Sequence, residues 1–226
     1  MKWHKSKQPV SQKRLLSPPD GYRYSPFLRR FKIFKISFKL IFFLWWDKVT
    51  GNNSARRRHR IAKWLVRKIL ELGPTFIKIG QSLSTRADLI PIEYIEEFGQ
   101  LQDRVPPFSS DLAIAVIEQE LGKPISVLFA EFNPTPLAAA SLGQVHKARL
   151  HTGEDVVVKV QRPGLARLFN LDFEILHHLV RWLNRLLKGI RKFNLEAIYR
   201  EFFELLYLEI DYIHEGKNAD RFRQNF

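Results

Sequence analysis

Glycine and proline divide the sequence into short segments, and their positions restrict the chain to a series of helices followed by one β-hairpin. Gly73 ends a stretch with helical apolar periodicity, and Pro74 stands where a new helix begins. Pro91 opens a further helix, which Pro106 and Pro107 end. Four helices are predicted in this part. The first runs from the basic cluster at 56–60 to residue 72, and the second begins at residue 74. The third covers 92–102, and the fourth covers 111–121 with Ser109 or Ser110 as its cap.

Residues 137–161 change to a strand pattern. The run 156–160 is rich in valine, and the segment 151–155 before it supplies a turn. Small side chains crowd the segment 138–143, which lets a backbone approach a ligand closely. We therefore predict two antiparallel strands with a small-residue loop before the first.

Two long helices are predicted after the hairpin, over 165–187 and from the cap Asn194 to about residue 222. The second helix carries Glu209, Asp211 and Glu215. At helical spacing Asp211 and Glu215 share a face and Glu209 points elsewhere. Together with the hairpin, these helices predict an α+β fold that is mostly helical and has a small antiparallel sheet.

Lys159 is a cation within the apolar run of the second strand. One interpretation is an edge residue whose ammonium reaches solvent. The other is a kinase-type strand lysine, which binds nucleotide phosphates and is held by a glutamate from a helix. The acidic residues of the last predicted helix are the candidates for that partner, and the pattern alone leaves both interpretations open.

The helix that begins at Pro74 contains the tetrapeptide Lys-Ile-Gly-Gln at 78–81. Lys78 and Gln81 are three residues apart, so they share a face and can reach the same partner. Gly80 costs about 1 kcal/mol relative to alanine inside a helix, which suggests that it permits a close approach of another element. The alternative is an exposed polar face beside a packing glycine.

The first 70 residues are strongly basic, with 19 Lys and Arg against two acidic residues, whereas the rest of the chain is close to neutral. Within residues 27–46 the basic residues Arg29, Lys32, Lys35 and Lys39 share one helical face, which adjoins a face of aromatic residues, and two tryptophans end the segment. The apolar run is too short to span a bilayer, which takes about 20 residues. We predict binding at an anionic membrane surface, with packing on the body as the alternative. Nucleic acid is not favoured, because no nucleic-acid-binding motif accompanies the basic residues.

The chain has no cysteine, which excludes disulfides, thiolate nucleophiles and zinc sites that need sulfur. His177 and His178 are adjacent and face different directions on a helix, so they offer no metal-ligand spacing. No metal ligand is therefore predicted. No apolar core follows the first lysines, so a secretory signal peptide is not expected either.

Four motifs in order resemble those of the UbiB/AarF family of atypical, protein-kinase-like proteins. The Lys-x-Gly-Gln motif matches residues 78–81, and the Glu-x-Asp motif matches residues 209–211. The matching residues are Lys78 and Gln81 of the first motif, Ala138, Ala139, Ala140 and Ser141 of an alanine-rich loop, Lys159 as the strand lysine, Glu209 and Asp211 of the last motif, and Glu215 as the helix glutamate. Gly143 and Gly216 depart from the family pattern, which usually has alanine there.

The resemblance implies a kinase-like amino-terminal lobe with family-specific helices laid over a nucleotide cleft. In such a lobe Lys159 contacts the phosphates of ATP or ADP, Glu215 orients Lys159, and the loop from Ala138 to Ser141 covers the phosphates. The residues expected in the cleft are Lys78 and Gln81, with Glu209 and Asp211 as their polar partners. The implied role is an atypical kinase or ATPase, peripheral on the cytoplasmic side of a membrane, that supports isoprenoid-quinone or lipid metabolism and works with quinone-biosynthesis proteins.

The catalytic part of the implied site is not expected within these residues. A kinase-like chain places its catalytic and magnesium-binding residues after the helix glutamate, and only 11 residues follow Glu215. No catalytic residue is assigned, whether the chain is an enzyme stays open, and Mg²⁺ ligands are expected in the missing half. The alternative function is a non-catalytic membrane- or protein-binding module. The predicted organisation is a basic arm at 1–55, a helical extension at 56–136 and a partial kinase-like domain at 137–226.

Overall fold

The structure, a computed structural model, describes residues 25–52, 54–102, 105–186 and 194–225. Their contacts divide them into two compact units, which are treated separately below. A helical unit comprises the described residues before 107 and those from Leu171 onward, and a sheet unit comprises 107–170. The predicted boundaries at residues 55 and 136 stay predictions.

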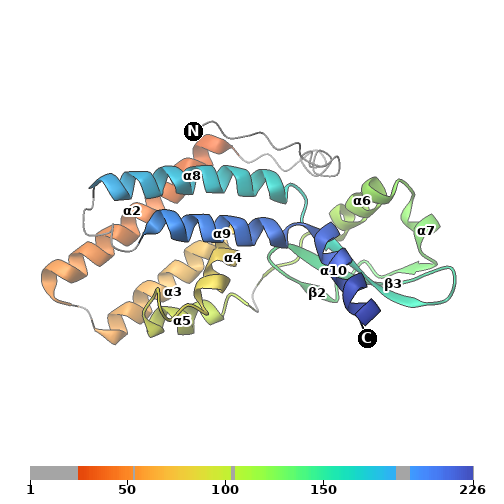
Figure 1. Cartoon of the computed structure of the whole chain (residues 1–226), viewed down its shortest axis with the longest axis horizontal. Coiled ribbons are helices and arrows are strands. Elements are labelled where there is room, and N and C mark those ends of the chain that lie inside the picture. Colours follow the sequence, from red (N-terminus) through yellow and green to blue (C-terminus); the bar gives the residue numbers. More distant parts are fainter. Residues whose placement is uncertain (1–24, 53, 103–104, 187–193, 226) are drawn as a thin grey trace. The chain divides into compact units, whose positions relative to one another are not determined.

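The helical unit is built from seven helices of the described chain, shown in Figure 1. They are α2 (Pro26–Thr50), α3 (Ala55–Leu72), α4 (Pro74–Leu83), α5 (Ile92–Gly99), the part of α8 (Leu165–Leu186) from Leu171, α9 (Leu195–Glu209) and α10 (Tyr212–Asn225). The predicted break between α3 and α4 is confirmed, since Gly73 takes a positive φ of 86° and Pro74 opens the next helix. The core of this unit lies between α3, α4 and α5, around buried residues such as Ala62, Ile77 and Phe98.

Helix α2 packs on the helical unit through one face, which is the second of the two alternatives drawn from its sequence, and its binding to a membrane stays a prediction. One face packs on the unit, where Ile33 is buried with Leu72 and Ile175. The other face is open, and its aromatic residues are exposed to solvent; they are Phe27, Phe31, Phe34, Phe38, Phe42, Trp45 and Trp46. The predicted cationic face is not uniform, because Arg29 is buried. Helix α2 is therefore a docked helix with an exposed aromatic surface.

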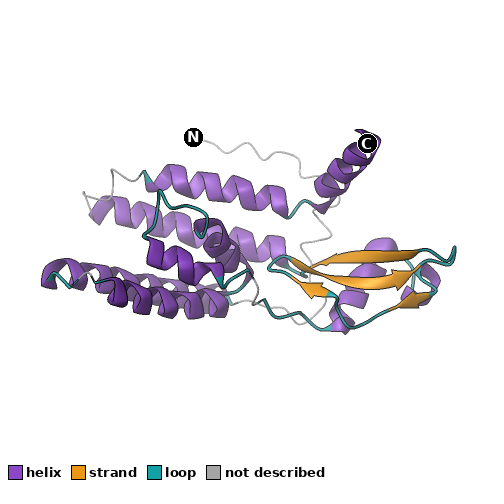
Figure 2. Cartoon of the chain, turned by 90° about the horizontal axis from the view of Figure 1, so that it is seen from below, coloured by secondary structure: helices purple, strands orange, loops and turns teal. Residues whose placement is uncertain are grey.

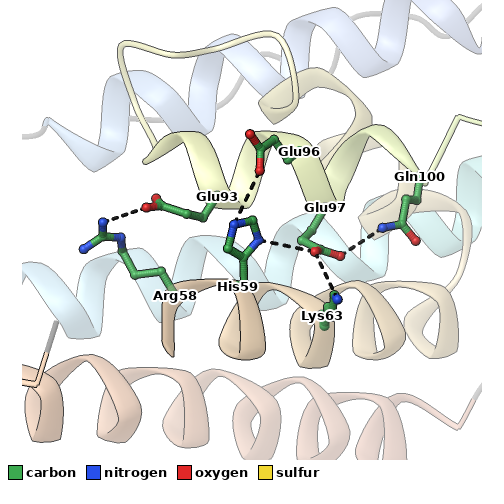
Figure 3. A network of polar contacts seen from close by, with 7 residues as sticks. All are labelled: Arg58, His59, Lys63, Glu93, Glu96, Glu97 and Gln100. Carbon is green, nitrogen blue, oxygen red and sulfur yellow. Dashed lines mark hydrogen bonds and ion pairs between the residues drawn. The ribbon is translucent and has the colours of Figure 1, made fainter. Parts of the chain in front are cut away.

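The basic cluster at the start of α3 is largely used inside the protein. Arg58 binds Glu93 of α5 at 2.6 Å, and this contact, followed by the backbone of Glu93 itself, lowers the pKa of the Glu93 carboxyl to about 2. Next to it, His59 lies between two glutamates of α5 (Figure 3). These two glutamates are Glu96 and Glu97, and Glu97 also contacts Lys63 and Gln100. The network joins α3 to α5, so these charges serve packing of the helical unit.

The sheet unit consists of a small antiparallel sheet with helices on one face (Figure 2). Its elements are α6 (Ser110–Leu121), α7 (Ile125–Leu128), β1 (Glu131–Phe132), β2 (Ala138–Ala139), β3 (Gly143–Arg149), β4 (Asp155–Gln161) and the first residues of α8. Strand β3 is central: it pairs with β4 along its whole length and with β1 and β2 at its two ends. The predicted hairpin and the α+β fold class are thus confirmed.

Alternation along the strands decides which face of the sheet is covered. Val156, Val158 and Val160 pack against α6 and α7, together with Ala148 of β3. Residues at odd positions of β4, including Lys159, lie on the opposite face. The capping predicted for α6 is also confirmed, because the Ser109 hydroxyl accepts a hydrogen bond from the Leu112 N–H and Gly122 ends the helix in the left-handed conformation.

The prediction of one uninterrupted helix after Asn194 is wrong. Helix α9 ends at Glu209 and α10 begins at Tyr212. Asp211 causes the new start, since its side chain accepts a hydrogen bond from the His214 N–H at 3.0 Å, as helix-capping aspartates do. Asp211 thus caps the helix that carries Glu215, and the Glu215 N–H donates to the Asp211 carbonyl at 3.1 Å, so the two residues lie one turn apart. Helix α5 also ends at Gly99, before the predicted residue 102.

Candidate functional site

In the helical unit, the Lys-x-Gly-Gln helix meets the Glu-x-Asp segment. The ammonium of Lys78 on α4 lies 2.6 Å from a carboxylate oxygen of Glu209 at the end of α9. The two residues are 131 positions apart in sequence, and both remain partly open to solvent, with side-chain exposures of 23% and 41%. This ion pair brings together the two motif residues that the resemblance expects to be partners.

At Gly80, α4 closely approaches its neighbours in the unit. A methyl group added at this position would lie 2.4 Å from Cδ1 of Leu101 and 3.3 Å from Cδ1 of Ile69. Leu101 is fully buried and has little room to move. The prediction of a close approach at this glycine is therefore confirmed, and the neighbouring element is the turn that follows α5.

Gln81 and Asp211 serve contacts other than the ion pair. The side-chain amide of Gln81 donates a hydrogen bond to the Leu101 carbonyl at 2.9 Å, which fixes α4 to the same turn that Gly80 contacts. Asp211 caps α10 through the His214 N–H. Of the four residues predicted for the cleft, the structure thus pairs Lys78 with Glu209. It assigns structural contacts to Gln81 and Asp211, and their roles toward a ligand stay predictions.

Tyr212 lies next to the two glutamates of this region. Its burial, and then the charges of Glu215 and Glu209, raise the pKa of the Tyr212 hydroxyl to about 12. The phenol therefore stays protonated at neutral pH and can act as a hydrogen-bond donor. Nothing in the sequence pattern singled out this tyrosine, although its position directly after the Glu-x-Asp motif is a signal that could have done so.

In the sheet unit, Lys159 lies in the middle of the open face. It is opposite Val145 of β3, and Val145 is in turn opposite Ala138 of β2, so the three residues form one row across the sheet. Side chains of directly opposed residues lie on the same face. Lys159 is exposed in this row, whereas the neighbouring Val158 and Val160 pack into the core on the other face.

The alanine-rich segment, which was predicted as a loop, begins with strand β2 (Ala138–Ala139) and continues in a tight turn at the end of the sheet. After the short strand β2, the Ala140 N–H donates to the Gly143 carbonyl at 2.8 Å, which closes the turn into β3. Ser141 is buried within it, and the Leu142 carbonyl accepts a hydrogen bond from the N–H of Arg162 after β4. The turn is thus held to both neighbouring strands, and the small side chains predicted here leave its backbone uncrowded.

A buried polar chain supports this sheet, and sequence reasoning missed it. The side chain of Gln144 accepts a hydrogen bond from the Phe108 N–H at 3.0 Å and lies 2.9 Å from Nε2 of His146. The other ring nitrogen of His146 lies 2.9 Å from the Asn133 carbonyl. With the Gln144 amide N–H directed at Nε2, Nδ1 donates to the Asn133 carbonyl, and these two contacts fix the orientation of the ring. Gln144 and His146 alternate with Val145, so the period of two was the available signal.

A second buried cluster lies beneath α4 and was also missed. The carboxylate of Asp172 on α8 accepts two hydrogen bonds from the Arg29 guanidinium, both at 2.7 Å. The Thr75 hydroxyl donates to the same carboxylate at 2.5 Å. Asp172 and Thr75 are fully buried, and Arg29 is nearly so. This cluster joins α2, the first turn of α4 and α8, and it positions the helix that carries Lys78.

One predicted pairing of site residues joins residues that belong to different units. Lys159 belongs to the sheet unit, whereas Glu215 lies on α10 of the helical unit. Their pairing therefore stays a prediction.

Among the described residues, no cluster of three or more histidine, aspartate or glutamate side chains is arranged to hold a metal ion. In the same part of the chain, no helix combines the length and apolarity that a membrane crossing requires.

Comparison with known proteins shows the family to which this chain belongs. The family model of the ABC1 atypical kinase-like domain matches residues 100–226, which is more than half of the chain. The chain therefore belongs to the ABC1 atypical kinase-like family, which includes the UbiB and AarF proteins. The family resemblance carried by the motifs of the sequence is thereby confirmed.

Several relatives are similar over most of this chain. An uncharacterized protein of Synechocystis sp. is 63% identical over 211 residues, which cover 92% of this chain and 37% of that protein. The chloroplastic protein ACTIVITY OF BC1 COMPLEX KINASE 7 of Arabidopsis thaliana is 52% identical over 78% of this chain and 25% of its own length. The probable protein kinase UbiB of Pseudomonas fluorescens is 42% identical over 73% of this chain and 33% of its own.

A solved structure is also similar in sequence. It is the complex of Rv3197 with erythromycin from Mycobacterium tuberculosis, which is 31% identical, with a TM-score of 0.41, and matches 74% of this chain and 41% of that one. The chain thus spans between a quarter and about two fifths of the length of these relatives.

Proposed function

We propose that this chain is the nucleotide-binding and membrane-associated region of a UbiB-like atypical kinase or ATPase that supports isoprenoid-quinone or lipid metabolism. The observation that carries the nucleotide part is the position of Lys159 on the open face of the sheet, in one row with the start of the alanine-rich turn. Membership of the ABC1 family supports the kinase-like class.

Two features of the sheet unit support the binding of nucleotide phosphates. Lys159 supplies an exposed cationic side chain, and the segment from Ala138 to Ser141 offers backbone without bulky side chains. In this proposal Lys159 binds the α- and β-phosphates of ATP or ADP, the turn covers them, and Glu215 orients the lysine. The accompanying Mg²⁺ would neutralise phosphate charge, and no residue of this chain is assigned to it.

Replacing Lys159 with alanine tests this role. A hydrogen bond that involves a charged group contributes about 1.5–3 kcal/mol, so we expect affinity for Mg-ATP to fall roughly 10- to 100-fold. Isothermal titration calorimetry of the 226-residue chain and of a longer chain of the same protein would measure it. Lys147 is the matched control, because it is exposed on the same face of the same hairpin, opposite Val157. An equal loss in Lys147→Ala would show a general effect of charge and would contradict the assignment to Lys159.

The exposed surface of α2 carries the membrane part of the proposal. Aromatic rings and the basic residues Lys35 and Lys48 share the solvent-facing side of this helix. Aromatic side chains suit the depth of lipid headgroups, and lysines are attracted to anionic lipid. Helix α2 would lie in the interface with its opposite face packed on the helical unit, which gives a peripheral location on the cytoplasmic side of a membrane.

Charge reversal on α2 tests the membrane part. We expect Lys35→Glu with Lys48→Glu to reduce co-sedimentation with vesicles that contain phosphatidylglycerol by at least tenfold at low salt, since each basic residue near an anionic surface contributes about 1 kcal/mol and its reversal adds repulsion. The control changes Lys123 and Lys147 of the sheet unit to glutamate, which alters net charge equally. Equal loss in both double variants, or no dependence on salt, would contradict a specific role of α2.

The second candidate is a non-catalytic membrane-binding module, and the exposed aromatic surface of α2 favours it independently of Lys159. The two candidates differ in one result. In a binding module, Lys159→Ala leaves every activity of the chain unchanged. In the nucleotide-dependent protein, the same variant loses nucleotide binding and keeps vesicle binding. The proposed quinone-biosynthesis partners would be sought with the longer protein bound to vesicles.

A further inference from the structure

A groove between α2 and α8 lies on the membrane-facing side proposed for the helical unit. It encloses about 460 Å³, a size within the range of small-molecule sites. Its walls are apolar and come from both helices: Phe31, Phe34, Phe38 and Ile41 of α2, and Leu179 and Trp182 of α8. Lys35 is the single charged residue of the lining.

The groove is firmly built, because its two helices are tied together at one end. Arg29 and Asp172 form the buried ion pair, and the neighbouring Arg30 binds Glu174 at 2.5 Å in a second, half-exposed ion pair. Ile33 packs against Ile175 in the core below. The walls of the groove are therefore held in place without a ligand, as they are in sites that are formed before binding.

The lining favours a long apolar occupant. From residue 31 to residue 41 the groove follows α2 for about 15 Å. Phe31 and Phe38 are 63% and 66% exposed, and covering apolar aromatic surface of this kind is favourable. An elongated hydrocarbon chain that lies along α2 would cover these rings and the floor at Leu179 together.

Lys35 specifies the charge of that occupant. Within the described part of the chain, Lys32 donates to the Glu71 carbonyl, and Lys39 lies over the rings of Phe43 and Trp64. Lys35, by contrast, makes no ion pair with any described residue and lies at the groove. We infer that the groove binds one acyl chain of an anionic membrane lipid, with the headgroup at Lys35. The inference rests on the proposed membrane association and adds a lipid site to it.

A soluble single-chain lipid tests the groove without any bilayer. The probe is palmitoyl lysophosphatidylglycerol, kept below its critical micelle concentration and titrated into the 226-residue chain by calorimetry. We expect saturable binding with one site, and at least tenfold weaker binding in Trp182→Ala, which removes a wall, and in Leu179→Trp, which fills the floor. Lys35→Gln should remove the preference over the zwitterionic palmitoyl lysophosphatidylcholine.

Trp46 supplies a control that separates the groove from the membrane surface of α2. It is exposed on α2 and does not line the groove. Trp46→Ala should weaken vesicle binding severalfold and leave probe binding unchanged, whereas Trp182→Ala should do the reverse. Thermal unfolding of each variant would establish that it is folded, and the exposed Trp182 keeps the test usable if Leu179→Trp unfolds.

The other outcomes overturn either the lipid site or the membrane proposal. Absence of saturable probe binding, or equal binding in Trp182→Ala and the unchanged chain, would exclude a lipid site even if vesicle binding persists. If the unchanged chain binds the probe but does not bind vesicles, the membrane proposal is refuted and the lipid site remains. Self-association that Trp182→Ala abolishes would place a second copy of the chain in the groove and overturn the lipid assignment.

Discussion

Replacing Arg29 with methionine is expected to lower the free energy of unfolding of the helical unit by about 3–5 kcal/mol. The variant leaves the carboxylate of Asp172 buried, with the Thr75 hydroxyl as its remaining hydrogen-bond partner among the described residues, and a buried charge without its counter-charge is strongly destabilising. Urea unfolding followed by tryptophan fluorescence measures the effect. Residues 107–170 contain no tryptophan, so the signal of Trp64 and Trp182 reports on the helical unit.

An ion pair between the same two helices provides the matched control. Arg30 and Glu174 lie 2.5 Å apart, but about half of each side chain is exposed. Arg30→Met should therefore cost less than about 1 kcal/mol. The double variant Arg29→Met with Asp172→Leu should recover most of the lost stability, because apolar replacement of both partners removes the unpaired charge. A loss at Arg29 no larger than that at Arg30 would contradict the assigned role of the buried cluster.

These two arginines also show why the sequence predicted elements better than contacts. Periodicity placed Arg29 on a cationic face of an amphipathic helix, and the helix exists over Pro26–Thr50. The partner of Arg29 is 143 residues away, and no local pattern indicates which of two neighbouring arginines turns inward. Charge composition therefore predicted the basic segment correctly and could not predict that one member is buried.

Helix boundaries, too, were predicted correctly only where the local sequence determines them. Those set by residues with strong backbone preferences, such as Gly73, Pro74 and Gly122, were predicted at their observed positions. The break before α10 was missed because Ile210 and Asp211 carry no such preference, and only the cap between Asp211 and His214 marks it. In the candidate site, the family resemblance predicted Lys78 and Glu209 as partners, whereas their helical faces alone did not.

Enlarging Gly80 tests the packing that holds the Lys-x-Gly-Gln helix in place. Gly80→Val should lower the free energy of unfolding by about 1–3 kcal/mol, the usual cost of inserting methyl groups into a packed core. The added Cβ would approach Leu101 to 2.4 Å, and Leu101 is surrounded by the core of α3, α4 and α5. Urea unfolding followed by tryptophan fluorescence again gives the magnitude.

Gly216 separates this packing effect from helix propensity. It lies inside α10, and no atom within 4 Å would meet an added Cβ. Gly216→Val changes helix propensity by the same few tenths of a kcal/mol as Gly80→Val, without the steric conflict. We therefore expect stability to change by less than about 0.5 kcal/mol, as at other open surface positions. Equal effects at the two glycines would mean that propensity decides both, and that α4 does not need a glycine to reach the turn after α5. A loss confined to Gly80 would mean that the motif glycine is required so that α4 can pack closely enough for Gln81 to bond the Leu101 carbonyl.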